Sequence, residues 1–237
     1  MACGYEMKTL GIIGGVGPES TIEYYQNIIA LYRERQRDGS YPEFIINSVD
    51  LKKGLDFMAA NNLTGVTDYL LEGIGKLARA GANFGLISAN TPHIVFEEVA
   101  SKSPIPLISI VEATCAAAKA RKLKRLALLG TRFTMQGTFY PKVFSRQGIE
   151  LVVPAPKDQD YIHDKYLNEL VLGKFLAETR DGLRAIVDRM QAKSDIDGVI
   201  LAGTELPLIL RDVDHKGIPL LDTTKIHCQA AVAEMLS

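Results

Sequence analysis

The 237-residue chain has no tryptophan, only three cysteines and no excess of charge of either sign. Its 27 lysines and arginines nearly balance its 28 aspartates and glutamates, and the formal net charge is −1. We therefore expect no surface for nucleic acid or for an anionic membrane. No apolar run approaches the roughly 20 residues of a membrane-spanning helix, and the N-terminus lacks the basic-then-apolar pattern of a secretory signal.

The cysteines give no sign of a metal site or of a disulfide framework. Cys3, Cys115 and Cys228 are odd in number and have no spacing typical of metal ligands. Cys115 and Cys228 lie in helical patterns, where a buried thiol packs as a small apolar side chain. We predict a cytoplasmic protein with no disulfide framework and no metal site.

The sequence is typical of an α/β protein. Apolar residues make up 47% of the chain and charged residues 23%, as in ordinary globular proteins. Short apolar runs alternate with amphipathic helical patterns, which is typical of parallel sheets with crossover helices. The predicted strands are 9–13, 43–48, 84–87 and 104–109 in the first half, and 126–129, 148–153, 199–202 and 219–224 in the second.

Two strand-and-loop segments of the first half recur in the second half at nearly the same offset. Residues 85–91 and 198–204 both read glycine, aliphatic, isoleucine, any residue, alanine, small, threonine, and residues 8–15 resemble 124–131 position by position. The repeat favours two similar Rossmann-like lobes. We assign residues 1–112 and 210–237 to the N-terminal lobe, and residues 113–209 to the C-terminal lobe.

The loops that follow these strands are the expected ligand site, because open α/β sheets bind ligands at the carboxyl ends of their strands. Gly15-Val16-Gly17, before a Pro-initiated helix, supplies two glycines of a dinucleotide fingerprint, but Ser20 stands where the third is needed. The match is weak, and we predict no bound cofactor.

Five ordered motifs resemble the aspartate/glutamate racemase family of cofactor-independent amino acid racemases, over nearly the whole chain. They are Gly11-Ile12-Ile13-Gly14-Gly15 with Glu19-Ser20-Thr21 and Tyr24-Tyr25, Asn90-Thr91-Pro92-His93, 129–135, Gly203-Thr204-Glu205-Leu206-Pro207, and Asp222-Thr223-Thr224 with Ile226-His227. The resemblance implies an isomerase with two α/β lobes related by a pseudo-twofold axis and an active site between them. It also implies a homodimer, and an acidic or related amino acid as substrate.

Members of this family remove the α-proton with one cysteine and return a proton to the opposite face from another, without pyridoxal phosphate. The resemblance assigns the two cysteine positions to Ala89 and Gly203, and neither side chain can transfer a proton. Candidate substitutes are Ser88, His93, Thr204 and Glu205, although His93 could cap a helix or pack, and Glu205 could cap or orient a neighbour. Cys228 is a further thiol, for which a core position is favoured.

The resemblance also implies a set of substrate-binding residues. Asn90, Thr91, Thr131, Thr134 and Thr204 fall on positions that hold substrate carboxylates, although serine and threonine also cap helices. Ser48 follows the second strand, and a side-chain carboxylate needs a cation, for which Lys52, Arg132 and Lys165 are candidates. His163 and Lys165 lie where relatives place a residue near the substrate.

Three functions stay open at this point. The chain could be a racemase, or a relative with other α-carbon chemistry, that uses different acid/base groups. It could be a catalytically silent protein that binds an amino acid or a dicarboxylate. A structural or nucleotide-binding α/β protein is the third alternative.

Overall fold

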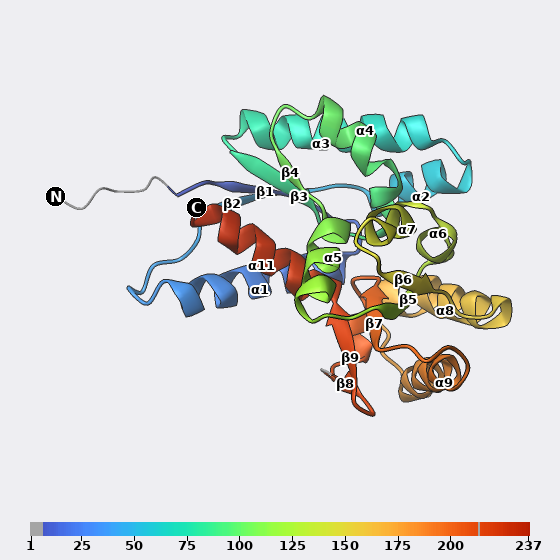
Figure 1. The fold of residues 1–237 in the computed structure, drawn as a ribbon. Helices are drawn as coiled ribbons and strands as arrows, with labels where there is room; N and C mark the ends of the chain where they lie inside the picture. The colour runs from blue at the N-terminus through green and yellow to red at the C-terminus, as the bar shows by residue number, and fades with distance from the viewer. Residues whose placement is uncertain (1–6, 213) are drawn as a thin grey trace.

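The computed structural model describes residues 7–212 and 214–237, and it contains two largely parallel β-sheets flanked by helices (Figure 1). The first sheet is fully parallel. Its strands, in spatial order, are β2 (Phe44–Ser48), β1 (Leu10–Gly14), β3 (Phe84–Ile87) and β4 (Leu107–Ile108).

The second sheet repeats this order and adds one strand. Its strands are β6 (Glu150–Val152), β5 (Arg125–Gly130), β7 (Gly198–Ala202), β9 (Ile218–Asp222) and β8 (Asp214–His215). The first four are parallel, and β8 pairs antiparallel with β9. In each sheet the strand that comes first in sequence, β1 or β5, is flanked by the second and third strands of its half, as expected from two similar half-molecules. The predicted α/β class with Rossmann-like parallel sheets is confirmed.

Both faces of the first sheet are covered by helices, which explains why its strands read as continuous apolar runs. Successive residues point to opposite faces, so Ile12 packs with α1 and α11 whereas Ile13 packs with α3. Figure 1 shows α3 and α4 on one side and α1 and α11 on the other. The first-half helices are α1 (Pro18–Arg35), α2 (Leu51–Ala59), α3 (Leu63–Arg79), the 3-10 turn η1 (Thr91–Val95), α4 (Phe96–Lys102) and α5 (Ile110–Ala120).

The second sheet is covered in the same way. Leu128 packs toward α5 and α7, and Leu129 packs toward α8 and α9. The remaining helices are α6 (Arg132–Gln136), α7 (Phe139–Ser145), α8 (Pro156–Asn168), η2 (Leu170–Leu172), α9 (Ala177–Ser194), α10 (Leu206–Ile209) and α11 (Thr223–Met235).

The boundary between the lobes near the C-terminus differs from the predicted one. Residues 210–222 were assigned to the N-terminal lobe, but β9 pairs with β7 in the second sheet. The physical reason is that the apolar run 218–221 completes the second sheet as its fourth parallel strand, as β4 does in the first. Only α11 packs on the first sheet, against α1. We use "first lobe" and "second lobe" for the two sheets with their helices.

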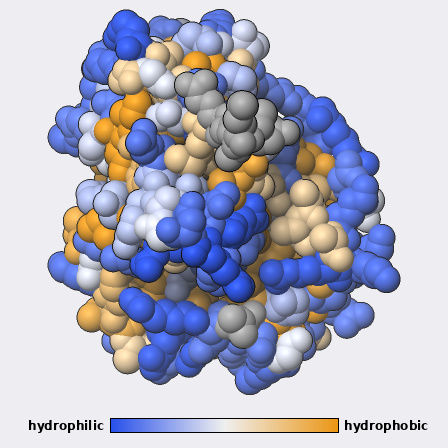
Figure 2. Space-filling model, turned by 90° about the vertical axis from the view of Figure 1, so that its left-hand side faces the viewer, coloured by the Kyte–Doolittle hydropathy of each residue, from blue (hydrophilic) through white to orange (hydrophobic). Residues whose placement is uncertain are grey.

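The surface is polar with scattered apolar side chains. Figure 2 shows one face of the molecule, on which hydrophilic residues predominate and apolar residues gather in patches between them. Among the residues that the structure describes, no helix has both the length and the apolar character needed to cross a bilayer.

Candidate active site

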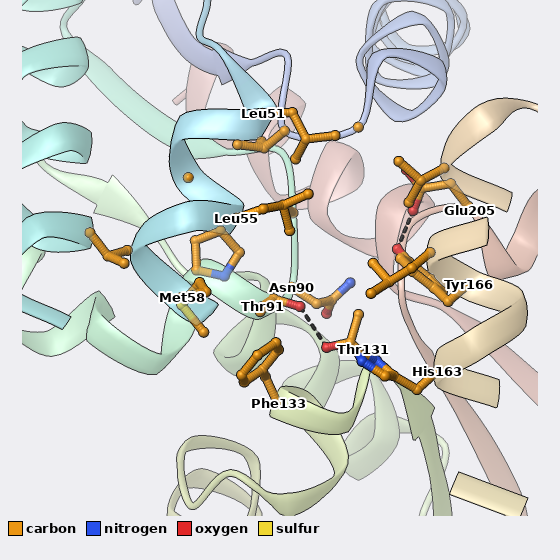
Figure 3. A pocket seen from close by; sticks show the side chains of 18 of the residues that line it. Leu51, Leu55, Met58, Asn90, Thr91, Thr131, Phe133, His163, Tyr166 and Glu205 are labelled. Carbon is orange, nitrogen blue, oxygen red and sulfur yellow. Dashed lines mark hydrogen bonds between the residues drawn. The ribbon is translucent and has the colours of Figure 1, made fainter. Parts of the chain in front are cut away.

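A pocket lies between the two lobes, at the carboxyl ends of strands from both sheets (Figure 3). Gly17 follows β1 and Ala89 follows β3, whereas Thr131 follows β5 and Glu205 follows β7. The cavity has a volume of about 90 Å³, several times the space that one water molecule needs. It therefore has room for a small molecule at the predicted ligand-binding edge.

The walls of the pocket are mostly apolar. Helix α2 contributes three apolar side chains, and α3, α6 and α8 contribute others (Figure 3). The main apolar lining residues are Leu51, Leu55, Met58, Leu70, Phe133 and Leu167. Such walls favour a ligand group without charge.

Three threonine hydroxyls from the two lobes meet at one side of the pocket. Thr91 Oγ1 in η1 lies 2.9 Å from Thr131 Oγ1 and 3.3 Å from Thr134 Oγ1. Thr131 is also the N-cap of α6, where its hydroxyl accepts a hydrogen bond from the Thr134 N–H. Thr91 and Thr131 line the pocket. Hydroxyl protons can turn toward an anion, so this cluster can bind a carboxylate.

Asn90 also lines the pocket, but its side chain is held by other residues. Its Oδ1 accepts a hydrogen bond of 2.6 Å from the Tyr140 hydroxyl, and its Nδ2 donates one of 3.1 Å to Thr223 Oγ1. Thr223 in turn donates to the carbonyl oxygen of Leu201. These bonds fix the amide across the junction of the lobes, with one N–H proton left for a ligand.

A buried carboxyl group closes the opposite side of the pocket. Glu205 is 1% exposed. Its Oε1 lies 2.6 Å from Ser20 Oγ, and its Oε2 accepts a hydrogen bond from the Tyr166 phenol and lies 3.2 Å from Thr204 Oγ1. Burial raises the pKa of Glu205, and the hydrogen bonds from Ser20 and Tyr166 partly oppose that rise. Tyr166 and Glu205 both line the pocket (Figure 3).

Two glycines make room for this arrangement. A Cβ at Gly203 would overlap the Tyr166 ring and would lie 3.1 Å from the phenolic oxygen. A Cβ at Gly17 would overlap Oε1 of Glu205, and the backbone there has φ of 113°, which few other residues adopt. The turn that resembled a dinucleotide fingerprint thus packs against the protein's own carboxyl group at the start of α1.

Known proteins share the sequence pattern and the fold of this chain. A family model described as Asp/Glu/Hydantoin racemase matches residues 13–231. The chain belongs to this racemase family.

Several relatives match nearly the whole of this racemase-family chain. The structure is similar to that of an Asp/Glu racemase candidate from Yersinia pestis, with a TM-score of 0.87, 30% identity, and coverage of 98% of this chain and 100% of that one. An aspartate racemase homologue from Pyrococcus horikoshii OT3 gives a TM-score of 0.83 and 32% identity, with the same coverage. The broad specificity amino-acid racemase RacX of Bacillus subtilis is 24% identical over 235 residues, 96% of this chain and 98% of the relative. The predicted family resemblance is confirmed.

In this racemase-family chain, Ala89 presents only a methyl group to the pocket. Ala89 is 7% exposed and lines the pocket. His93, a predicted substitute, does not line it: its Nδ1 lies 2.9 Å from the carbonyl oxygen of Ala89, and its Nε2 accepts a hydrogen bond from the Ile110 N–H. Burial lowers the pKa of His93 to about 3, so the ring is neutral and both nitrogens are occupied by backbone. The structure gives His93 a positioning role instead of a proton-transferring one.

Ser88 and Ser48 also lie away from the pocket. The Ser88 hydroxyl is fully buried and donates to the carbonyl oxygen of Ile13 in the neighbouring strand, because it points to the other side of the strand end from Ala89. Ser48 is at the exposed end of β2. Cys228 is buried in the core of the first lobe, and burial raises the pKa of its thiol.

The three predicted cations lie outside the pocket. The Lys52 side chain is 81% exposed and pairs with Asp56, Arg132 pairs with Asp160 at 2.8 Å, and Lys165 pairs with Glu169 at 2.5 Å. The Lys52 and Arg132 pairs are exposed, whereas the Lys165–Glu169 pair is partly buried. Among the residues that the structure describes, no lysine or arginine lines the pocket, and no cluster of acidic, histidine or cysteine side chains could hold a metal.

Tyr166 is a polar pocket residue that the sequence analysis missed, and its neighbour His163 was predicted only as lying near the substrate. Both lie on α8, at positions three residues apart that share one face with Leu167. The His163 Nδ1 accepts a hydrogen bond from the Arg132 N–H at 3.2 Å, and burial lowers the pKa of His163. The neutral ring therefore carries its proton on Nε2.

The buried histidines predict a loss of stability in acid. Burial lowers the pKa of His93 to about 3 and of His227 to about 4, from the usual 6.5. Above pH 6.5 both rings are neutral in folded and unfolded chains, so their contribution is complete. As the pH falls from 6.5 toward 4, only the unfolded chain takes up these protons. Each proton lowers the free energy of unfolding by about 1.4 kcal/mol per pH unit.

Urea unfolding at a series of pH values measures this slope. A His93→Asn variant should be less stable than the wild type above pH 6.5. Below pH 6.5 its free energy of unfolding should fall less steeply with pH, by the contribution of one proton. Equal slopes in the two proteins would mean that His93 is protonated in the folded chain.

The packing of Tyr166 over Gly203 predicts an asymmetry between two glycine substitutions. Gly203→Ala should destabilise the protein by about 1–3 kcal/mol, because the ring must move. Gly54→Ala in α2, where no heavy atom lies within 4 Å of the new Cβ, should be neutral or stabilising by up to about 1 kcal/mol. Thermal unfolding of both variants tests this, and equal effects would contradict the packing.

Proposed function

We propose that this chain is an enzyme of the racemase family that acts at the α-carbon of a small amino acid with an uncharged, apolar side chain. The single observation that carries the proposal is the division of one interlobe pocket into hydroxyl donors on one side, a buried carboxyl group on another and apolar walls elsewhere. The proposal includes removal and return of the α-proton without a cofactor.

The substrate carboxylate is assigned to the threonine cluster. Thr91 and Thr131 reach the pocket from opposite lobes, and the Nε2–H of neutral His163 and the free N–H of Asn90 are further donors. Hydrogen bonds to a charged group contribute about 1.5–3 kcal/mol each. A carboxylate bound by both threonines would also connect the two lobes. Its binding would therefore depend on how the two sheets are positioned relative to each other.

The apolar walls argue against the acidic substrate suggested by the family resemblance. A second carboxylate would lie among Leu55, Met58 and Phe133 with no lysine or arginine of the described chain beside it. An unpaired charge in such surroundings is strongly disfavoured. The Bacillus subtilis relative is described as a broad specificity amino-acid racemase, which is compatible with a substrate other than aspartate or glutamate.

A second candidate function is binding without catalysis. It is favoured by one observation, the methyl group of Ala89 at a position where the family resemblance implies an acid/base cysteine. A sensor or transport partner needs the carboxylate-binding hydroxyls and the apolar walls, but no proton transfer.

The location and assembly of the protein are part of the proposal. The homodimer is implied by the family resemblance, and the cytoplasmic location is favoured by three cysteines without a disulfide pattern. Light scattering after size exclusion measures the assembly.

Calorimetric titration with L-leucine, L-methionine, L-aspartate and L-glutamate tests the substrate class. We expect the apolar amino acids to bind at least about tenfold more tightly than the acidic ones, since the pocket has no partner for a second charge. Equal or tighter binding of aspartate would contradict the apolar assignment, and binding of none of the four would contradict the proposed function.

Removal of one hydroxyl tests the carboxylate site. Thr131→Val should weaken the binding of L-leucine about tenfold or more, because a hydrogen bond to a charged group is lost. Ser109→Ala is the matched control: it also removes an N-cap hydroxyl, on α5, but lies outside the pocket. The control should lose a similar amount of stability and retain its affinity, and unchanged binding by Thr131→Val would place the carboxylate elsewhere.

A further inference from the structure

The proposed reaction needs a group that takes up a proton from the α-carbon and gives one back. Of the pocket-lining residues that the structure describes, the titratable ones are Tyr69, His163, Tyr166 and Glu205. The Tyr69 hydroxyl is bound to the backbone N–H and carbonyl oxygen of Asp50. Neutral His163 uses its unprotonated nitrogen to accept from a backbone N–H, so toward a ligand it can only donate.

We propose that Tyr166 and Glu205 together are the proton-transferring pair, and that they act on one face of the α-carbon only. This inference deepens the proposed function and rests on it. It assigns the chemistry to a phenol and a carboxylate that contact each other directly.

The position of Tyr166 supports this assignment. Its ring extends from α8 across the end of β7 into the space that a side chain at Gly203 would occupy, with the phenolic oxygen 3.1 Å from the place of the absent Cβ. The phenol thus stands at the strand end where a side chain of residue 203 would face the cleft. Behind it, Glu205 Oε2 accepts the phenolic proton, as Figure 3 shows.

The step balances without an oxidant or a second reactant. The α-carbon–hydrogen bond breaks and its proton bonds to the Tyr166 oxygen, while the phenolic proton of Tyr166 moves to Glu205 Oε2. The electron pair stays on the α-carbon and is delocalised into the substrate carboxylate, which the threonine hydroxyls hold. In deuterated water the phenolic hydrogen of Tyr166, which lines the pocket, exchanges with solvent. The reverse transfers then form a carbon–deuterium bond and restore the phenol and the carboxylate.

The electrostatics of the pair agree with these roles. Burial and the nearby carboxylate raise the pKa of Tyr166 well above its usual value, so the phenol is protonated at rest and serves as a relay. Burial raises the pKa of Glu205, which makes proton uptake less unfavourable than at an exposed carboxylate. The Ser20 hydroxyl, at 2.6 Å from Oε1, stabilises the ionised form.

Among the described residues of the first lobe that line the pocket, none matches this pair. Ala89 lines the pocket from the first lobe with a methyl group, and His93 behind it is neutral with both nitrogens occupied. A proton returned by Tyr166 arrives on the face from which it left. The expected outcome is exchange of the α-hydrogen with retention of configuration, and inversion that is much slower.

The test follows L-leucine in deuterated water with wild-type protein. Proton NMR measures loss of the α-proton signal, chiral chromatography measures D-leucine, and calorimetry measures affinity. We expect exchange to exceed racemisation clearly. Tyr166→Phe keeps the ring over Gly203 and should reduce exchange by roughly 100-fold or more with nearly unchanged affinity, because only the relay is lost.

Two further variants complete the design. Glu205→Gln preserves the shape of the side chain but cannot take up a proton, and it should reduce exchange as strongly. Tyr161→Phe removes a phenol from the same helix, outside the pocket, and should exchange at the wild-type rate. A wild-type melting temperature in Tyr166→Phe excludes misfolding as the cause.

The remaining outcomes separate this inference from the function on which it rests. Failure of L-leucine to bind overturns both. Binding without exchange by the wild-type protein overturns the inference and favours the silent binder. Exchange by Tyr166→Phe at the wild-type rate, or racemisation as fast as exchange, overturns the assignment of the pair while the enzyme function stands.

Discussion

The burial of one carboxyl group, that of Glu205, is the constraint on which the arrangement of the cleft depends. A carboxylate removed from water is strongly destabilised unless hydrogen bonds replace its hydration. Here Ser20 comes from the first lobe, and Tyr166 and Thr204 come from the second. Because these donors lie on different lobes, satisfying the carboxylate also fixes how the two sheets meet.

The same constraint explains the glycines beside it. Gly17 leaves space for Oε1 at the start of α1, and Gly203 leaves space for the Tyr166 ring. A larger residue at either position would displace the carboxylate or its phenol donor. The absence of a side chain at position 203 is therefore coupled to the presence of a tyrosine on α8, and the two are best considered as one structural feature.

Behind the pocket, buried polar side chains have a supporting role. His93 joins the carbonyl oxygen of Ala89 to the N–H of Ile110, and His227 joins the Tyr24 hydroxyl to the carbonyl oxygen of Ile108. Each satisfied bond holds a strand end or a helix start near the cleft in place. Both nitrogens of His93 are held by backbone groups, so this histidine supports the site and is not free to exchange a proton with a ligand.

The sequence by itself determined the α/β class, the repeat of two half-molecules and the racemase family, because strand periodicity, Gly- and Pro-marked turns and ordered motifs are local properties. It also placed Asn90, Thr91, Thr131 and Glu205 at strand ends that meet in one pocket. Asp56 and Glu169, each four residues after a lysine, were a visible signal that Lys52 and Lys165 form ion pairs one helical turn away. Only the tertiary structure decided that β9 joins the second sheet and that Tyr166 covers Gly203. Both depend on contacts between segments far apart in the chain, whose packing no local pattern specifies.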